Sequence, residues 1–222
     1  MSRYLTKSRY LLGLNCPTKL YYTGKSDYPD KNEDNDFLEA LAEGGYQVGA
    51  LAKCYYPKGI EIESRDYDAS VRETFNLLKR PSVVLFEAAF MWQNLFIRAD
   101  IVEKKDRVIN LFEVKAKSFG GNDSTEMLTT ENYINSAWLD YLYDVAYQKY
   151  VISKMYPDYE VRAHLMLANK NATATVDGLN QKFQLKKIEG DRTYVDVVGV
   201  ESITDLGDEI LIRINVDNLL EL

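Results

Sequence analysis

Histidine and cysteine are the scarcest reactive residues of this 222-residue chain, which has one histidine and two cysteines. Cys16 and Cys54 cannot build a disulfide framework, and an iron–sulfur cluster usually needs four thiolates. We therefore expect no iron–sulfur cluster, and we expect Cys16 to be a small buried side chain. His164 lies inside the apolar run VRAHLMLA, which indicates a packed or edge-strand histidine. The sequence offers no Ser-His-Asp set and no Cys-His nucleophile arrangement.

Long apolar runs and an excess of positive charge are also missing. No run approaches the roughly 20 residues of a membrane span, and the start, MSRYLTKSRY, lacks the apolar core of a signal peptide. We therefore expect a cytoplasmic protein with no membrane partner. The formal charge of −7 argues against a broad DNA-coating surface, although it leaves room for a local basic groove. The absence of a glycine-rich phosphate loop argues against ATP use.

The most informative segment that is present is IRADIVEKKDRVINLFEVKAKS. Two apolar stretches surround a polar turn at residues 104–106, which predicts a β-hairpin in which residue 100 lies opposite residue 111. Because side chains alternate between faces, Asp100, Glu113 and Lys115 then share one face. Two carboxylates beside an amine suit a hard divalent cation, Mg²⁺ or Mn²⁺, with Lys115 stabilising or deprotonating a nucleophile.

A second hairpin in the preceding segment adds a third acid to this face. The run SVVLFEAAFMWQNLFIRAD turns near Gln93 and Asn94, so Glu87 is expected directly opposite Asp100. Neighbouring carboxylates repel each other unless a positive charge lies between them, and a metal ion would supply it. A slip of one residue would instead place Glu87 on the other face.

The remaining patterns predict one domain with extensions, since 46% hydrophobic residues are enough for a sizeable core. The order helix, three antiparallel strands, helix, strand predicts an α/β (α+β-like) fold with a mixed central sheet flanked by helices. Helices are expected over residues 3–25 (short pieces, Pro17 in a first turn), 37–51 (interrupted at Gly44 and Gly45), 68–79 and 133–155, and strands over 83–115, 161–168, 192–200 and 209–216. We assign residues 1–36 to a helical segment and an acidic linker, and 37–170 to the core. Residues 171–222 are assigned to a β-rich extension, which either ends the protein or leads into a missing C-terminal part.

The long helix after the hairpins carries two further candidates. Asp144 and Gln148 are one turn apart and share a face, and an amide near a hydrolytic metal site can hold a phosphate or orient water. For Asp144 a surface role and a functional role stay equally open, whereas for Gln148 we favour function because this helix must pack beside the hairpin. Lys117, Lys149 and Tyr150 are assigned to nucleic-acid contacts.

The arrangement D-(x12)-E-x-K followed by a helix with glutamine resembles the PD-(D/E)XK nuclease superfamily, in its RecB-like branch. The resemblance implies a restriction-endonuclease-like core in the order α-β-β-β-α-β. It implies a metal held by Asp100 and Glu113, with Lys115 and Gln148 as catalytic residues. To these ligands our hypothesis adds Glu87 and the Val114 carbonyl. The branch usually has Gln-x-x-x-Tyr, but here position 152 is isoleucine and the nearest tyrosine is Tyr150.

The resemblance covers residues 5–170 and includes the start of the chain. The run LTKSRYLLGLNCPTKLYY is similar to the opening of iron–sulfur RecB-like nucleases, although two cysteines cannot close such a cluster. GYQVGALAKCYYPKGIEI and YDVAYQKYVI are similar to a bacterial family of predicted RecB-like nucleases. The first core helix, where the superfamily often has histidine or glutamate, offers only Gln47, with Glu39 and Glu43 upstream.

Three functions follow from these patterns. The first is a divalent-metal-dependent nuclease acting on DNA, single-stranded DNA included. The second is a catalytically idle nucleic-acid-binding or interaction module that retains the nuclease fold. The third is a structural interaction domain in which Glu113 and Lys115 form an exposed cross-strand ion pair of little energetic weight.

Overall fold

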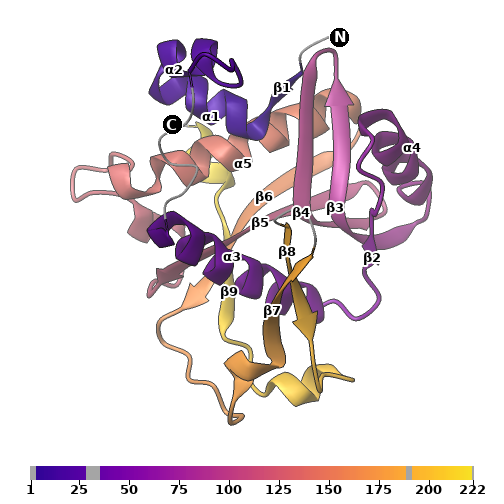
Figure 1. The fold of residues 1–222 in the computed structure, drawn as a ribbon, viewed down its shortest axis with the longest axis vertical. Coiled ribbons are helices and arrows are strands. Elements are labelled where there is room, and N and C mark those ends of the chain that lie inside the picture. The colour runs from indigo at the N-terminus through magenta and orange to yellow at the C-terminus, as the bar shows by residue number, and fades with distance from the viewer. Residues whose placement is uncertain (1–3, 29–35, 189–191, 222) are drawn as a thin grey trace.

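The structure is a computed structural model that describes residues 4–28, 36–188 and 192–221 (Figure 1). Most of the predicted acidic linker over 26–36 lies outside the described residues. No helix in the described ranges is long and apolar enough to cross a membrane.

The centre of the fold is a mixed sheet in the order β2-β3-β4-β5-β6-β9, with β1 added beside β4. Its strands are β1 (Leu5–Thr6), β2 (Ile60–Glu61), β3 (Ser82–Trp92), β4 (Leu95–Lys105), β5 (Val108–Phe119), β6 (Glu160–Asn169) and β9 (Leu211–Asn215). Strands β3, β4 and β5 form the predicted antiparallel meander, while β6 runs parallel to β5 after a helical crossover. The predicted mixed sheet flanked by helices is therefore present.

The helices are α1 (Lys7–Asn15), α2 (Pro17–Tyr22), α3 (Asp36–Cys54), α4 (Tyr67–Leu77) and α5 (Ser136–Met155), with short 3-10 helices η1 (Ser124–Met127), η2 (Leu179–Lys182), η3 (Ile203–Leu206) and η4 (Asp217–Glu221). Pro17 lies in the first turn of α2, as predicted. The prediction that Cys16 is buried is wrong. It is exposed, and its sulfur caps α2 by accepting from the Lys19 N–H.

The predicted interruption of the helix at Gly44 and Gly45 is also wrong, because α3 is continuous from Asp36 to Cys54. Glycine costs about 1 kcal/mol in a helix interior, a penalty that tertiary packing can outweigh. The packing is supplied by Leu51 and Ala52, which are buried against the sheet.

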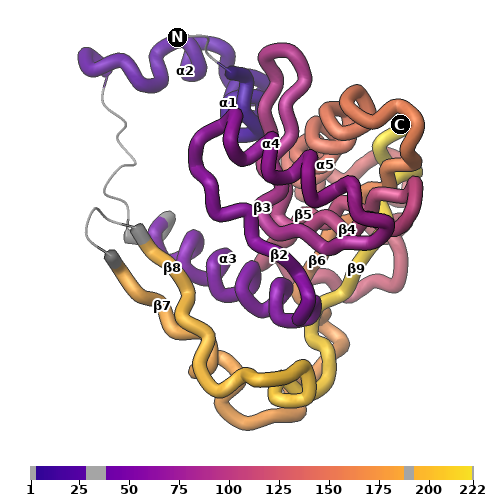
Figure 2. Tube along the Cα trace, turned by 90° about the vertical axis from the view of Figure 1, so that its right-hand side faces the viewer, coloured from indigo at the N-terminus to yellow at the C-terminus, as the bar shows by residue number. Residues whose placement is uncertain are grey.

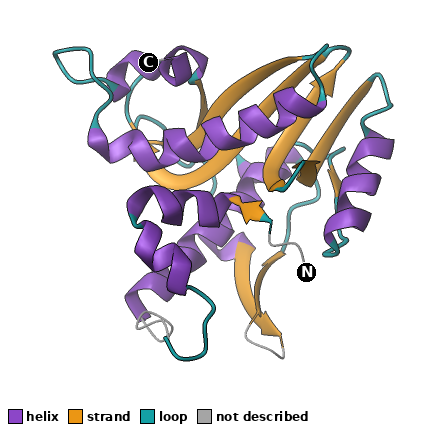
Figure 3. Cartoon of the chain, turned by 90° about the horizontal axis from the view of Figure 1, so that it is seen from above, coloured by secondary structure: helices purple, strands orange, loops and turns teal. Residues whose placement is uncertain are grey.

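Helices cover the two faces of the sheet, and each face has its own core (Figure 3). On one face α5 packs through Val145 and Val151 onto β-strand residues such as Leu111. On the other face α3 packs near Phe112 and Met166. Figure 2 shows α3 between the sheet and a separate two-stranded hairpin. The large buried areas on both faces are the main source of stability for such a sheet.

That hairpin, β7 (Phe183–Ile188) and β8 (Arg192–Val197), forms part of the predicted β-rich extension. Strand β7 was not predicted, because QKFQLKKI has few apolar residues to mark a strand. The backbone carbonyl of Phe183 accepts a bond from Gln47 Nε2 at 2.8 Å, which ties β7 to α3. The last strand, β9, leaves the extension and pairs with β6 in the main sheet.

Candidate functional site

The predicted register between β4 and β5 is wrong by two residues. The turn lies at Asp106 and Arg107, with Asp106 at φ 54°, so Ile101 pairs with Phe112 and Val102 with Leu111. A shift of the turn by one residue moves the pairing by two. Because a shift of two preserves the alternation of faces, Glu113 and Lys115 still lie on the predicted side of β5.

The register between β3 and β4 agrees with the prediction, but the alternation of faces does not. Phe86 pairs with Ile101 and Ala88 with Ala99, so Glu87 lies opposite Asp100. However, Leu85 and Ala88, three residues apart, both belong to the core that contains α5. The alternation of side chains between the two faces of β3 is therefore offset by one residue. The irregularity lies at Glu87, whose backbone is left-handed with φ 55°.

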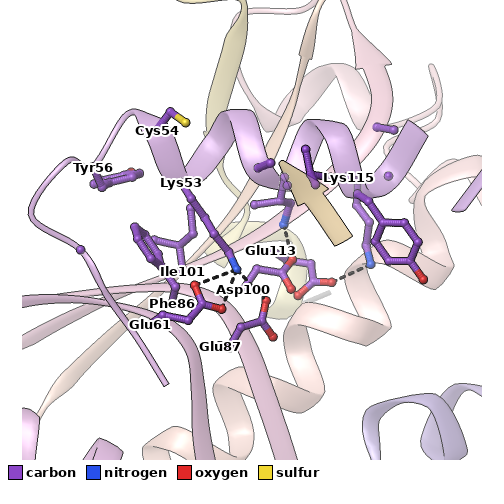
Figure 4. Close-up of a pocket in the computed structure, with 18 of the residues that line it drawn as sticks. Lys53, Cys54, Tyr56, Glu61, Phe86, Glu87, Asp100, Ile101, Glu113 and Lys115 are labelled. Carbon is purple, nitrogen blue, oxygen red and sulfur yellow. Dashed lines mark hydrogen bonds and ion pairs between the residues drawn. The ribbon is translucent and has the colours of Figure 1, made fainter. Parts of the chain in front are cut away.

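Glu87 lines the same pocket as Asp100 and Glu113, but an ion pair engages its carboxylate. Its carboxylate pairs with Lys53 of α3 at 3.2 Å, and Lys53 also binds Glu61 at 2.9 Å (Figure 4). Lys53 therefore occupies the Glu87 carboxylate that was predicted to bind the metal ion.

Asp100 lies where β4 and β5 stop pairing. The pairs run from Lys105–Val108 to Ile101–Phe112, and beyond them the Asp100 carboxylate accepts the backbone N–H of Val114 at 2.8 Å. The Asp100 side chain thus takes the place of the next backbone hydrogen bond between β4 and β5. Beside the start of β4 the added strand is β1, whose Leu5 and Thr6 pair with Leu95 and Phe96.

Glu113 is the centre of a polar cluster and is only 1% exposed. The Lys115 ammonium lies 2.6 Å from Glu113 Oε1 and 2.9 Å from Asp144 Oδ2. Gln148 Nε2 donates to Glu113 Oε2 at 2.6 Å and to Asp144 Oδ1 at 3.2 Å. Thus α5 contributes both of its predicted candidates, and Asp144 is buried inside the cluster rather than on the surface. Within the described residues, Gln148 Oε1 is buried without a hydrogen-bond partner.

Lys7 is a member of the cluster that sequence reasoning missed. Its ammonium donates to Glu113 Oε1 at 2.8 Å and lies 3.6 Å from Asp144 Oδ1. More than a hundred residues separate Lys7 from either acid, so no local spacing could reveal the contact. The motif LTKSRYLLGLNCPTKLYY marks its segment but does not distinguish this lysine.

The charged groups of the cluster shift one another's pKa values. Burial and then the charge of Glu113 raise the pKa of Asp100 to about 7 and that of Asp144 to about 6. Burial also acts to raise the pKa of Glu113, but Lys7 and Lys115 outweigh it and lower that pKa to about 2. Burial acts to lower the pKa values of both lysines, but the surrounding carboxylates, Glu113 first, raise them above the ordinary range. Both lysines are therefore ammonium ions.

The cluster opens into a pocket of about 1270 Å³ between α3 and the sheet (Figure 4). Lys7, Asp100, Glu113 and Lys115 line the pocket, and Tyr194 of β8 contributes to its wall. A pocket of this size can admit a ligand as large as a nucleotide.

Of the three residues assigned to nucleic-acid contacts, Lys117 lines the pocket, and its ammonium lies 4.6 Å from the centre of the Trp138 ring. Lys149 pairs with Asp217 at 2.6 Å, and Tyr150 packs edge-on against Trp92. Neither Lys149 nor Tyr150 is among the described residues that line the pocket. His164 stacks on Phe112, as expected for a packed histidine.

In its present arrangement the described part of the chain contains no group of three or more acidic, histidine or cysteine side chains that could hold a metal ion. The ammonium groups of Lys7 and Lys115 both lie between the carboxylates of Glu113 and Asp144. Comparisons of the chain with family models, with curated proteins and with solved structures gave no match.

Proposed function

We propose that this chain is a Mg²⁺- or Mn²⁺-dependent nuclease that hydrolyses phosphodiester bonds of DNA, with a restriction-endonuclease-like core of the RecB-like type. The observation that supports the proposal best is the cluster in the pocket. Glu113 and Lys115 of β5 meet Gln148 of α5, and Asp100 of β4 lies close enough for its pKa to respond to Glu113. Buried acids and an amine held at the edge of an open pocket are typical of functional sites.

The donors of the cluster are oxygen atoms, the ligand type of a hard divalent cation, although within the described residues they do not form a ready-made metal site. Asp100, Glu113 and Asp144 offer carboxylate oxygens, and the unpartnered Oε1 of Gln148 is a further oxygen beside them. Magnesium is commonly held by one or two carboxylates with water completing its shell, so Asp100 and Glu113, with the Val114 carbonyl, would be sufficient. A bound cation of this kind lowers the pKa of a coordinated water and offsets the charge of the phosphate.

The chain's own residues have separable roles in this proposal. Asp100 and Glu113 would bind the cation, and Gln148 holds Glu113 in place through its amide N–H. Lys115 is fully protonated, so it acts through its charge beside the phosphate rather than as a base. Lys117, at the same pocket, would contact the nucleic-acid backbone.

The direct test is cleavage of labelled single-stranded and duplex DNA by the purified chain with Mg²⁺, with Mn²⁺ and with EDTA. Glu113→Gln is the matched variant, because glutamine keeps the shape but loses the charge that binds the cation. We expect metal-dependent cleavage by the wild type and a rate at least about a hundredfold lower in the variant. Equal rates in both proteins, or no cleavage by the wild type, would contradict the proposal.

One observation favours the second candidate, a catalytically idle module. Lys7 and Lys115 already neutralise much of the carboxylate charge without a metal ion. If that arrangement is permanent, calorimetric titration with Mn²⁺ should give no heat of binding to the wild type, and nucleic-acid binding should be unaffected by EDTA.

A further inference from the structure

Lys7 occupies an unusual place for a positive charge. It is the first residue of α1, and the N-terminus of a helix carries a partial positive charge that disfavours cations. Lys7 nevertheless points its ammonium into the carboxylate cluster, where its side chain is 23% exposed. The attraction of Glu113, Asp100 and Asp144 offsets the loss of water around this ammonium group.

The fold delivers Lys7 to this point by specific contacts. Strand β1 runs parallel to the start of β4, so the chain enters beside Phe96 and reaches the cluster one residue later. The Leu5 carbonyl accepts a bond from the Tyr147 hydroxyl at 2.5 Å, and Tyr10 stacks on the Tyr147 ring at 4.5 Å. These contacts attach both ends of the segment to α5, which also carries Asp144 and Gln148. These contacts therefore fix the backbone of Lys7 beside the cluster.

Glu113 accepts bonds from three donors in this structure. Lys7 and Lys115 both bind Oε1, and Gln148 binds Oε2, so three donors surround one carboxylate. Each carboxylate oxygen has about two lone-pair positions, and Lys7 and Lys115 occupy both at Oε1, so a cation that uses Oε1 competes with these two lysines. Lys115 and Gln148 come from the strand and helix that form the site. Lys7 alone comes from the N-terminal segment.

We propose that Lys7 is a positioning residue that takes the place of the divalent cation in the metal-free protein, holding Glu113 and Asp144 together, and that it must leave Glu113 before that carboxylate can ligate a metal. This inference rests on the proposed function, since it takes a divalent cation as the ligand of the site. It makes the N-terminal segment a determinant of metal affinity.

The test is calorimetric titration of Mn²⁺ into the wild type, Lys7→Met and Lys7→Arg. Removal of one positive charge from a half-buried site should tighten Mn²⁺ binding by Lys7→Met about tenfold or more. Lys7→Arg keeps the charge and should bind Mn²⁺ no better than the wild type. Lys149→Met is the matched control, because Lys149 is similarly exposed at 27% and also loses an ion pair, but it does not contact the cluster. Its Mn²⁺ affinity should equal that of the wild type.

A merely structural Lys7 predicts the opposite sign, because a loosened cluster would bind Mn²⁺ more weakly. Unchanged or weaker binding by Lys7→Met would therefore overturn the inference. If Lys7→Met does not fold, acetylation of wild-type Lys7 by acetic anhydride, followed by mass spectrometry, replaces it. Mn²⁺ should increase the labelling of Lys7 and leave that of Lys149 unchanged, and equal labelling with and without Mn²⁺ would overturn the inference. Neither result depends on cleavage, so the proposed function can fail or succeed separately in the Glu113→Gln assay.

Discussion

Lys115→Ala should lower the rate of DNA cleavage by about two orders of magnitude or more, the usual effect of losing one preorganised electrostatic group. Lys115 lies 2.6 Å from Glu113 and 2.9 Å from Asp144, so its ammonium is fixed beside the carboxylates that would bind the cation. Because those carboxylates remain, Mn²⁺ binding should be intact, or slightly tighter after loss of a nearby positive charge. Single-turnover cleavage and calorimetry measure the two quantities separately.

Two further variants control this result. Lys115→Arg keeps the charge but aims planar donors differently, so it should restore the rate only in part. Lys53→Ala removes a lysine of similar exposure that lines the same pocket and pairs with Glu61 and Glu87 rather than with Glu113, so it should lower the rate far less. Full activity of Lys115→Ala, under conditions in which Asp100→Ala is inert, would remove Lys115 from the mechanism.

Asp100→Asn should raise the stability of the metal-free protein at pH 8 and have little effect at pH 4. The pKa of Asp100 is raised to about 7 in the fold, from an ordinary value of 3.8, chiefly by burial. Between these two pH values the folded protein retains a proton that the unfolded chain has lost, so this group destabilises the fold as the pH rises. Above pH 7 the cost is fully present. Asparagine does not titrate, and its side-chain oxygen can still accept the Val114 N–H.

The size of the effect follows from the shift. Each pKa unit corresponds to about 1.4 kcal/mol, but relaxation around a charged site reduces the sum, and we expect a gain of about 1–2 kcal/mol at pH 8. That gain should raise the melting temperature by roughly 2–8 °C for a chain of this length. Thermal melts in EDTA from pH 4 to pH 8 measure it.

Asp144 also destabilises the fold as the pH rises, since its pKa is raised to about 6. It is present in both the wild type and Asp100→Asn, so it does not contribute to the difference between them. Glu113 acts in the opposite direction, because its pKa is lowered to about 2 and its contribution is lost only as the pH falls below about 4.5. Parallel melting curves for the wild type and Asp100→Asn across the whole pH range would show that Asp100 carries no such cost. Mn²⁺ should stabilise the wild type more than the variant, because the variant lacks a proposed ligand.

Local patterns were sufficient to predict the meander and most of the site. Alternating apolar residues and two polar turns determined β3, β4 and β5, and the spacing of Glu113 and Lys115 put them on one face. The prediction survived an error in the turn because the period of a strand is two, and the error was also two residues. Gln148 was found because a helix that directly follows the hairpin has to cover it.

The sequence by itself therefore determined the strand order of the meander and the shared face of Glu113 and Lys115 on β5, since these depend on residues close together in the chain. Only the tertiary structure decided the slip at Glu87, the continuity of α3 through Gly44, and the arrival of Lys7 beside Glu113. Each of these depends on contacts between distant segments, and their free energy outweighs local preference. Lys7 is the clearest case, because nothing near it in the chain indicates a buried acid, and parallel pairing of β1 with β4 is what brings it there.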